Sequence, residues 1–300
     1  MPFLALVSLG GDNRKLGLDC RKLNMPHAIL FYLSHPPGQD VPRYLDRYAH
    51  GFFFHMISEL DPVLGTELHD LPRKPFTLTP LPWNPYPVLR LTTLDDSLFE
   101  VFVDMAQKMD ERGLTLGNRD FKLLRVVATP EGHPLAGFTP WEEILTAAPK
   151  NDLELMFLTP TVFATSKPGG RTRHTPIPDP RLIMGSLLSN WQAFSPAPYS
   201  DPEVAALREI FDLDLVVGGF DNLKYHHVHA GKDFFPGYTG KVRLRLLSPA
   251  IEARAALARL GALAYYSGVG AKTPFGLGMT AEVHRLEAKR SKSGKANSQV

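Results

Sequence analysis

The spacing of apolar residues predicts a helix over residues 43–60. At about 100° per residue, six apolar side chains of this stretch share one stripe, as in a helix that covers a core: Leu45, Ala49, Phe52, Phe53, Met56 and Leu60. The Asp61-Pro62 pair either ends this helix or begins a shorter one that runs to Leu68. A second helix is expected over residues 95–109, where an aspartate stands at both 95 and 96 as a suitable N-cap.

Short runs rich in β-branched and aromatic residues predict the strands of the first half of the chain. They lie at residues 27–34, 76–81, 88–94 and 121–128. Together with the two helices they give the order strand–helix–strand–strand–helix–strand, which is the ferredoxin-like unit.

The second half begins near Asp152 and predicts a similar arrangement. Strands are expected at residues 153–158 and 161–165, on either side of a bend at Pro160, and at 213–217, 242–247 and 277–286. Helices are expected at residues 178–194 and 251–266. We therefore predict an α+β protein of two tandem ferredoxin-like (RRM-like) domains, with antiparallel sheets and helices packed on one face.

These patterns set the expected domain limits. The N-terminal domain spans residues 25–150, with 130–150 as the connector, and the C-terminal domain spans residues 151–288. Residues 1–24 are either an N-terminal extension or an edge element, because a cleaner strand pattern opens after Met25. The basic tail, residues 289–300, is rich in serine and lysine and is expected to be disordered.

Composition narrows the function classes. The formal net charge is only +2, so any contact with a polyanion must come from local basic clusters. Cys20 is the only cysteine, which excludes an internal disulfide and is typical of a reducing cytosol. No stretch approaches the roughly 20 apolar residues of a membrane span. We expect a cytoplasmic protein with no membrane partner.

The most distinctive motif lies at residues 265–279. It contains four glycines in a G-x-G-x5-G-x-G pattern with Lys272 between the pairs: Gly268, Gly270, Gly276 and Gly278. Successive exposed N–H groups in such a turn form an anion-binding nest, and the lysine adds a point charge. The alternative is a turn that only joins two core elements. Standard nucleotide loops fit poorly, because Leu277 follows Gly276 and because a helix precedes the loop.

Further motifs follow one another along the chain at residues 48–54, 61–64, 68–70, 74–81, 157–163, 178–184, 191 and 237–242. With the glycine loop and the duplicated fold, they resemble the RAMP superfamily of CRISPR-associated proteins, and within it the Cas6-type endoribonucleases. The resemblance implies metal-independent cleavage of CRISPR precursor transcripts within their repeats, to produce guide crRNA. Attack by a 2′-hydroxyl would leave a 2′,3′-cyclic phosphate and a 5′-hydroxyl, without a cofactor.

The resemblance also implies a partner, which is CRISPR repeat RNA as a stem-loop or a single strand. A CRISPR effector complex and a homodimer are further partners that it leaves open. Two other functions remain as alternatives. One is a non-catalytic RAMP-type RNA-binding subunit of an effector complex. The other is a nucleotide-binding metabolic enzyme, which the absence of a standard fingerprint weakens.

Cleavage by an internal 2′-hydroxyl needs a base, an acid and a cation, and histidine suits either proton role. The resemblance implies a catalytic histidine at His50, and in some members at His69 with a lysine just beyond it, here Lys74. Those members also use a tyrosine that would fall at Phe54, which has no hydroxyl, so the three-residue version is incomplete here.

Each histidine also has a structural alternative. His50 is alternatively satisfied by a neighbour on the helix flank, and His69 by the helix end and Asp70. His55 lies about 140° around the helix from His50, and we interpret it as structural.

Basic side chains outside the glycine loop are further candidates for RNA contact: Arg73, Arg171, Arg173 and Lys241, with His174, Arg243 and Arg245 nearby. In the segment 226–229, His227 and His229 would share a strand face, as a chelating pair would. No carboxylate or cysteine accompanies them at a recognisable spacing, so we expect no metal site.

Overall fold

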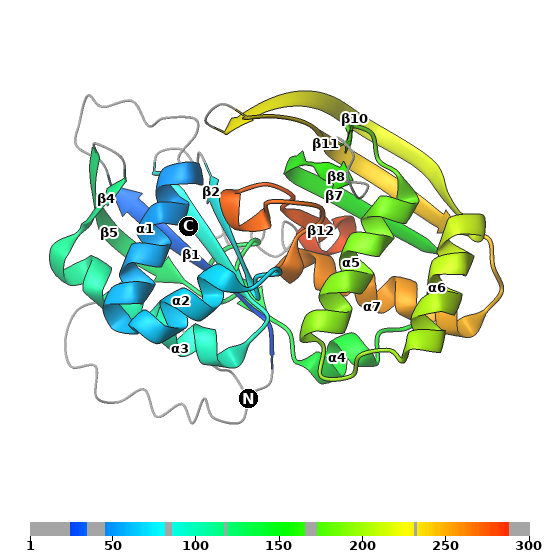
Figure 1. Ribbon diagram of the computed structural model, residues 1–300, viewed down its shortest axis with the longest axis horizontal. Coiled ribbons are helices and arrows are strands. Elements are labelled where there is room, and N and C mark those ends of the chain that lie inside the picture. Colours follow the sequence, from blue (N-terminus) through cyan, green and yellow to red (C-terminus); the bar gives the residue numbers. More distant parts are fainter. Residues whose placement is uncertain are drawn as a thin grey trace, which may run out of the picture. The chain divides into compact units, whose positions relative to one another are not determined.

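A computed structural model describes residues 25–34, 46–81, 86–116, 119–165, 173–230 and 233–287. The expected extension, residues 1–24, and the expected tail, residues 289–300, lie outside the described residues. The chain divides into two compact units, residues 1–140 and 141–300 (Figure 1). The division falls inside the stretch 130–150 that we expected to connect the two halves.

The N-terminal unit is an antiparallel sheet with helices. Its elements are β1 (His27–Ser34), α1 (Asp46–Leu60), α2 (Pro62–Asp70), β2 (Phe76–Leu81), β3 (Val88–Thr93), α3 (Asp96–Arg112), β4 (Leu114–Leu116), β5 (Arg119–Val127) and β6 (Gly137–Phe138). The strand order is β2-β3-β1-β5-β4, and β6 pairs with the start of β1. The four long strands follow the ferredoxin-like order, so this prediction is confirmed.

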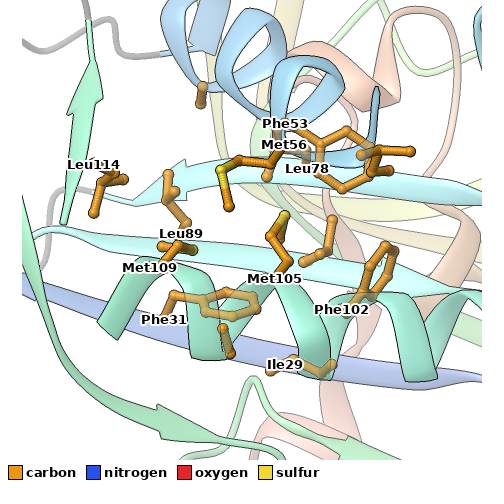
Figure 2. Packing of buried hydrophobic residues seen from close by; sticks show 14 of the residues in the cluster. Ile29, Phe31, Phe53, Met56, Leu78, Leu89, Phe102, Met105, Met109 and Leu114 are labelled. Carbon is orange, nitrogen blue, oxygen red and sulfur yellow. The ribbon is translucent and has the colours of Figure 1, made fainter. Parts of the chain in front are cut away.

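Helices α1 and α3 cover one face of this sheet, and their apolar stripes meet the strands in a single core (Figure 2). From the predicted α1 stripe, Ala49, Phe53 and Met56 are buried. The ring of Phe53 packs against Phe76 of β2 and Phe102 of α3, at centroid distances of 4.5 and 5.7 Å.

The Asp61-Pro62 pair begins a new helix, which settles the alternative left open by the sequence. The Asp61 side chain accepts hydrogen bonds from the amides of Val63 and Leu64, at 2.9 and 3.0 Å, and caps α2. Gly65 lets α2 fold back closely on α1, because a Cβ there would lie 2.5 Å from Ser58 Oγ. This turn determines where the end of α2 lies relative to α1.

The C-terminal unit repeats the ferredoxin-like order. Its elements are α4 (Trp141–Leu145), β7 (Asp152–Thr161), β8 (Phe163–Thr165), β9 (Arg173–Thr175), α5 (Pro180–Phe194), α6 (Asp201–Asp214), β10 (Leu215–Ala230), β11 (Asp233–Leu246), α7 (Ile251–Ser267), the 3₁₀ turn η3 (Thr273–Phe275) and β12 (Thr280–Glu282). The antiparallel sheet has the order β10-β11-β7-β12, and β8 pairs with β9. Both halves are thus ferredoxin-like.

Three expected strands of this unit have other limits than predicted. Strand β7 continues through Pro160, where the β7–β11 register shifts and a missing N–H is tolerated. Of the strand expected at 213–217, residues 215–217 begin β10, whereas residues 213–214 end α6, a helix that was not predicted. The strand expected at 277–286 is reduced to Thr280–Glu282, because residues 283–287 turn into a helix.

Helix α7 is buried around most of its circumference, between the sheet and the other helices of its unit. At Gly261 a Cβ would lie 2.5 Å from Leu153 Cδ1, so glycine allows this helix to approach β7. None of the helices in the described part of the chain has the length and apolarity to cross a membrane.

Shortening a buried side chain of the N-terminal core should lower the stability of the protein. Phe102 is fully buried, and Phe102→Ala should lower the free energy of unfolding by about 3–5 kcal/mol through lost burial and the cavity left behind. Val103 on the same helix is 43% exposed, so Val103→Ala should change the free energy of unfolding by no more than about 0.5 kcal/mol. Urea denaturation followed by circular dichroism measures both. Equal effects of the two variants would contradict this view of the core.

His27, at the start of β1, has a side chain that is only 12% exposed. Its ring stacks on Phe99 with a centroid distance of 4.1 Å. Burial lowers the pKa of His27 to about 4 from 6.5. The carboxylate of Asp96, 3.4 Å from His27 Nε2, acts in the opposite direction. Burial dominates, because only 12% of the His27 side chain is exposed and desolvation disfavours the charged imidazolium.

The native state therefore binds fewer protons than the unfolded state between pH 6.5 and about 4, and stability falls as the pH falls through this window. When the pH is lowered from 7 to 5, the free energy of unfolding should fall by about 2 kcal/mol less in His27→Gln than in the unmodified protein. Urea titrations at the two pH values measure this difference. The exposed His55→Gln should follow the unmodified protein, whereas an unchanged pH slope in His27→Gln would refute the assignment.

Candidate functional site

Phe54 lies between the two predicted catalytic histidines. Its ring centroid is 4.9 Å from that of His50, one turn earlier on α1, and 5.6 Å from that of His69 on α2. Both contacts are edge-on, with interplanar angles of 63° and 79°. The turn capped by Asp61 thus brings imidazoles from two successive helices against one side chain. The sequence alone shows that Phe54 lacks a hydroxyl, but not that its ring contacts both histidines.

The two imidazoles differ in their surroundings. His50 is half-buried, whereas His69 is exposed. His69 Nδ1 lies 3.4 Å from Asp70 Oδ1, and both side chains are more than 70% exposed. Because water screens such a pair, this contact contributes little to stability. His55 is exposed and lies 3.4 Å from Glu59 Oε1, one helical turn further on, which fits its structural interpretation.

Lys74 is fixed at the C-terminal end of α2. Its Nζ donates to the carbonyl oxygens of His69 and Leu71, at 2.6 and 2.5 Å. Burial lowers the pKa of Lys74, and the charge of Asp70 acts in the opposite direction. An ammonium has three donors, so a third hydrogen remains for another acceptor. Arg73 is exposed in the same loop, one residue earlier.

The glycine loop needs glycine at each of its four positions. The φ angles are 64° at Gly268, 89° at Gly270, 85° at Gly276 and 68° at Gly278, all in the region that favours glycine. A Cβ on Gly270 would lie 2.5 Å from the carbonyl oxygen of Val162. On Gly278 it would lie 2.0 Å from that of Val269.

The expected nest of exposed amides is wrong for most of this loop, because the protein itself uses those N–H groups. Val269 donates to Gly278, Gly270 to Ser186 Oγ, Ala271 to Val162, Gly278 to Pro160 and Met279 to Thr159 Oγ1, at distances of 2.8 to 3.0 Å. What the loop presents outward is mainly the side chain of Lys272, which is exposed.

Two of these anchors were missed by sequence reasoning. Ser186 on α5 lies 84 residues before Gly270, and Thr159 lies 120 residues before Met279. Neither spacing carries a local signal. The motif 157–163 did mark the β7–β8 segment, but not its role as the support of the glycine loop.

The other predicted RNA contacts are scattered over this unit. Arg173 is exposed on β9, and Arg171 lies outside the described residues. Lys241 Nζ pairs with Glu154 at 2.9 Å, while Arg243 and Arg245 reach Asp152 at 3.1 and 2.9 Å. The face that looked basic in sequence therefore carries its own acidic partners. Such exposed pairs are weak, so a phosphate can still compete for them.

Two histidines of the β10–β11 hairpin, His226 and His227, have partners close by. His226 Nε2 lies 2.7 Å from Thr239 Oγ1. The ring of His227 contacts Tyr225 and Phe234, at centroid distances of 4.7 and 4.6 Å. Within the described residues there is no group of three or more potential metal ligands.

Two tandem ferredoxin-like units, of which the second carries a glycine loop before its last strand, define a RAMP-type protein. Residues 155–280 match the family model described as CRISPR-associated endoribonuclease Cas6. Among curated proteins none matches the chain.

Solved structures of Cas6 proteins match nearly the whole described chain. The product complex of Cas6 TTHB231 is 56% identical with a TM-score of 0.82, and the match covers 87% of this chain and 100% of that one. Another structure of TTHB231, from Thermus thermophilus, is 54% identical with a TM-score of 0.71, covering 86% and 98%. The product complex of Cas6 TTHA0078 is 28% identical with a TM-score of 0.72, covering 86% and 99%. The chain belongs to the Cas6 family of CRISPR-associated endoribonucleases.

The close approach at Gly278 gives a test of the loop geometry. Gly278→Ala should lower the free energy of unfolding by at least about 2 kcal/mol, because it combines a left-handed backbone with a steric overlap. A Cβ on Gly185 in α5 meets nothing within 4 Å, so Gly185→Ala should leave stability unchanged or raise it by up to about 1 kcal/mol. Urea denaturation followed by tryptophan fluorescence compares them. A silent Gly278→Ala would contradict the loop geometry.

Proposed function

We propose that this protein is a metal-independent endoribonuclease that cleaves CRISPR precursor transcripts within their repeats and produces guide crRNA. The observation that carries the proposal is the pair of imidazoles, His50 and His69, held against the single ring of Phe54. The similarity to Cas6 structures with bound product supports it.

Two imidazoles on one surface suit transesterification by an internal 2′-hydroxyl. One imidazole takes the 2′-proton as the new O2′–P bond forms. The other gives a proton to the 5′-oxygen as the P–O5′ bond breaks. The products are a 2′,3′-cyclic phosphate and a 5′-hydroxyl. Each positioned acid or base is worth about 10²–10⁴-fold in rate.

Lys74 supplies the electrostatic part of this proposal. Its ammonium is held by the carbonyls of His69 and Leu71, so it needs no reorganisation before it meets the phosphate. The remaining hydrogen donates to a non-bridging oxygen, whose charge grows in the transition state. This arrangement requires no metal ion for charge stabilisation.

Repeat RNA is held by phosphate contacts in the proposal. Lys272 provides the main contact in the glycine loop, with Arg73, Arg173 and Lys241 as further cations, all of which the structure leaves exposed or partly exposed. Affinity should then fall with salt by a log–log slope of roughly 0.7–0.9 per phosphate contacted. Stem shape and unpaired flanking bases would provide selectivity.

One experiment separates this function from a non-catalytic RNA-binding subunit. A transcript that carries a CRISPR repeat is incubated with the protein in a chelator, beside a transcript with 2′-deoxyribose at the cleavage site. Cleavage of the first alone supports the proposal. Binding without cleavage of either would show a non-catalytic subunit. Cleavage of both would exclude attack by the 2′-hydroxyl.

Substitution of the imidazoles tests their roles. His50→Ala should lower the single-turnover cleavage rate by more than tenfold while the affinity for repeat RNA is nearly unchanged, and His69→Ala should act in the same direction. His55→Ala is the matched control on the same helix and should cleave normally. A large effect of His69→Ala with none for His50→Ala would make His69 the main catalytic group. Normal rates in both would exclude this site.

A further inference from the structure

Lys272 adopts a backbone conformation that is unfavourable for lysine. Its φ and ψ angles are 60° and 35°, in the left-handed region. At the four other positive-φ positions of the loop the chain has glycine, which reaches this region without a steric penalty. A side chain kept at such a position, where glycine would be easier, points to a use for that side chain.

The ammonium of Lys272 lies over two aromatic rings. Its Nζ is 4.8 Å from the ring centroid of Phe235 on β11 and 5.3 Å from that of Phe275 in η3. Both distances are within the range of cation–π attraction. Lys272 itself is exposed, so one side of the ammonium still faces solvent.

The ring of Phe235 is in turn held in place. It packs on a small apolar cluster formed by Val162, Val228 and Leu277. The imidazole of His174 also meets it edge-on, with a centroid distance of 5.6 Å and an angle of 81°. The carbonyl of Val162 accepts the Ala271 amide, so the same segment supports both the ring and the loop.

We propose that Phe235 and Phe275 are positioning residues that hold the Lys272 ammonium in place for an RNA phosphate. A free lysine side chain loses much rotamer freedom on binding, and a lysine already held loses less. The rings attract the ammonium from one side and leave N–H groups on the other side for phosphate oxygens. This inference rests on the proposed function, because it assumes that the loop binds repeat RNA.

The first test separates binding from folding at position 272. Lys272→Gly removes the cation and relieves the left-handed backbone, so the melting temperature should stay the same or rise. The affinity for a repeat-containing transcript should fall about tenfold, and the salt slope should fall by roughly 0.7–0.9. A lower melting temperature with unchanged affinity would show that Lys272 is structural and would overturn the inference.

The second test addresses the rings. Phe235→Leu should weaken affinity about two- to fivefold, the effect of one exposed cation–π contact. Phenylalanines with one, two or three ring fluorines at position 235 keep the shape and progressively remove the negative ring face. Affinity should therefore fall stepwise along this series, in the Lys272 protein but not in Lys272→Gly. Phe220→Leu, at a 66% exposed site on the neighbouring strand β10, is the matched control and should bind normally.

The outcomes are distinguishable from failure of the proposed function. If the unmodified protein binds and cleaves repeat RNA but the fluorine series has no effect, the inference is wrong and the function stands. If Phe235→Leu binds more tightly, the lysine leaves the rings on binding, and the inference is again wrong. If the unmodified protein does not bind repeat RNA, both the proposed function and this inference are wrong.

Discussion

The glycine loop of the C-terminal unit is folded by main-chain hydrogen bonds to the β7–β8 segment, and this contact determines what the loop can do. The amides of Ala271 and Gly278 donate to the carbonyls of Val162 and Pro160. At Gly270 and Gly278 the backbone approach is too close for any side chain. Because those amides are already used, they cannot also bind an anion. The loop that the sequence predicts as a phosphate-binding nest thus has most of these amides paired within the protein and an exposed lysine at position 272.

In the N-terminal unit, side-chain contacts position the candidate catalytic groups. The Asp61 cap and the close approach at Gly65 fold α2 back on α1, and this fold places His69 on the same phenyl ring as His50. Lys74 then donates hydrogen bonds to two carbonyl oxygens at the C-terminal end of α2. The candidate acid, base and cation are therefore positioned by local helix geometry within some 25 residues. The ring of Phe54 also meets Phe76 of β2, with a centroid distance of 6.0 Å, so the helix pair is itself positioned by the sheet.

The sequence predicted those parts of the fold in which one face of an element is apolar and its ends carry clear signals. Helices α1 and α3 and strands β1, β2 and β3 belong to this class, as do the Asp95 cap and the positive φ angles of the loop. The pattern failed where tertiary contacts decide. Strand β10 contains bulges and polar residues that hide its alternation, and β12 ends after three residues. The partners of Lys241 and the anchor at Ser186 come from distant segments, so no local spacing could reveal them.

Phe54 shows how one substitution in a family pattern changes the expected chemistry. A tyrosine there would offer a hydroxyl beside His69, whereas a phenyl ring offers only an edge and a face. In this chain both imidazoles pack edge-on against that ring, so in the proposed reaction the ring can only orient them. Proton transfer in the proposed reaction must then be divided between two histidines and cannot be shared with a phenol. The proposed role of the rings in the glycine loop is similar. There, aromatic rings position a charged group and take no part in the chemistry themselves.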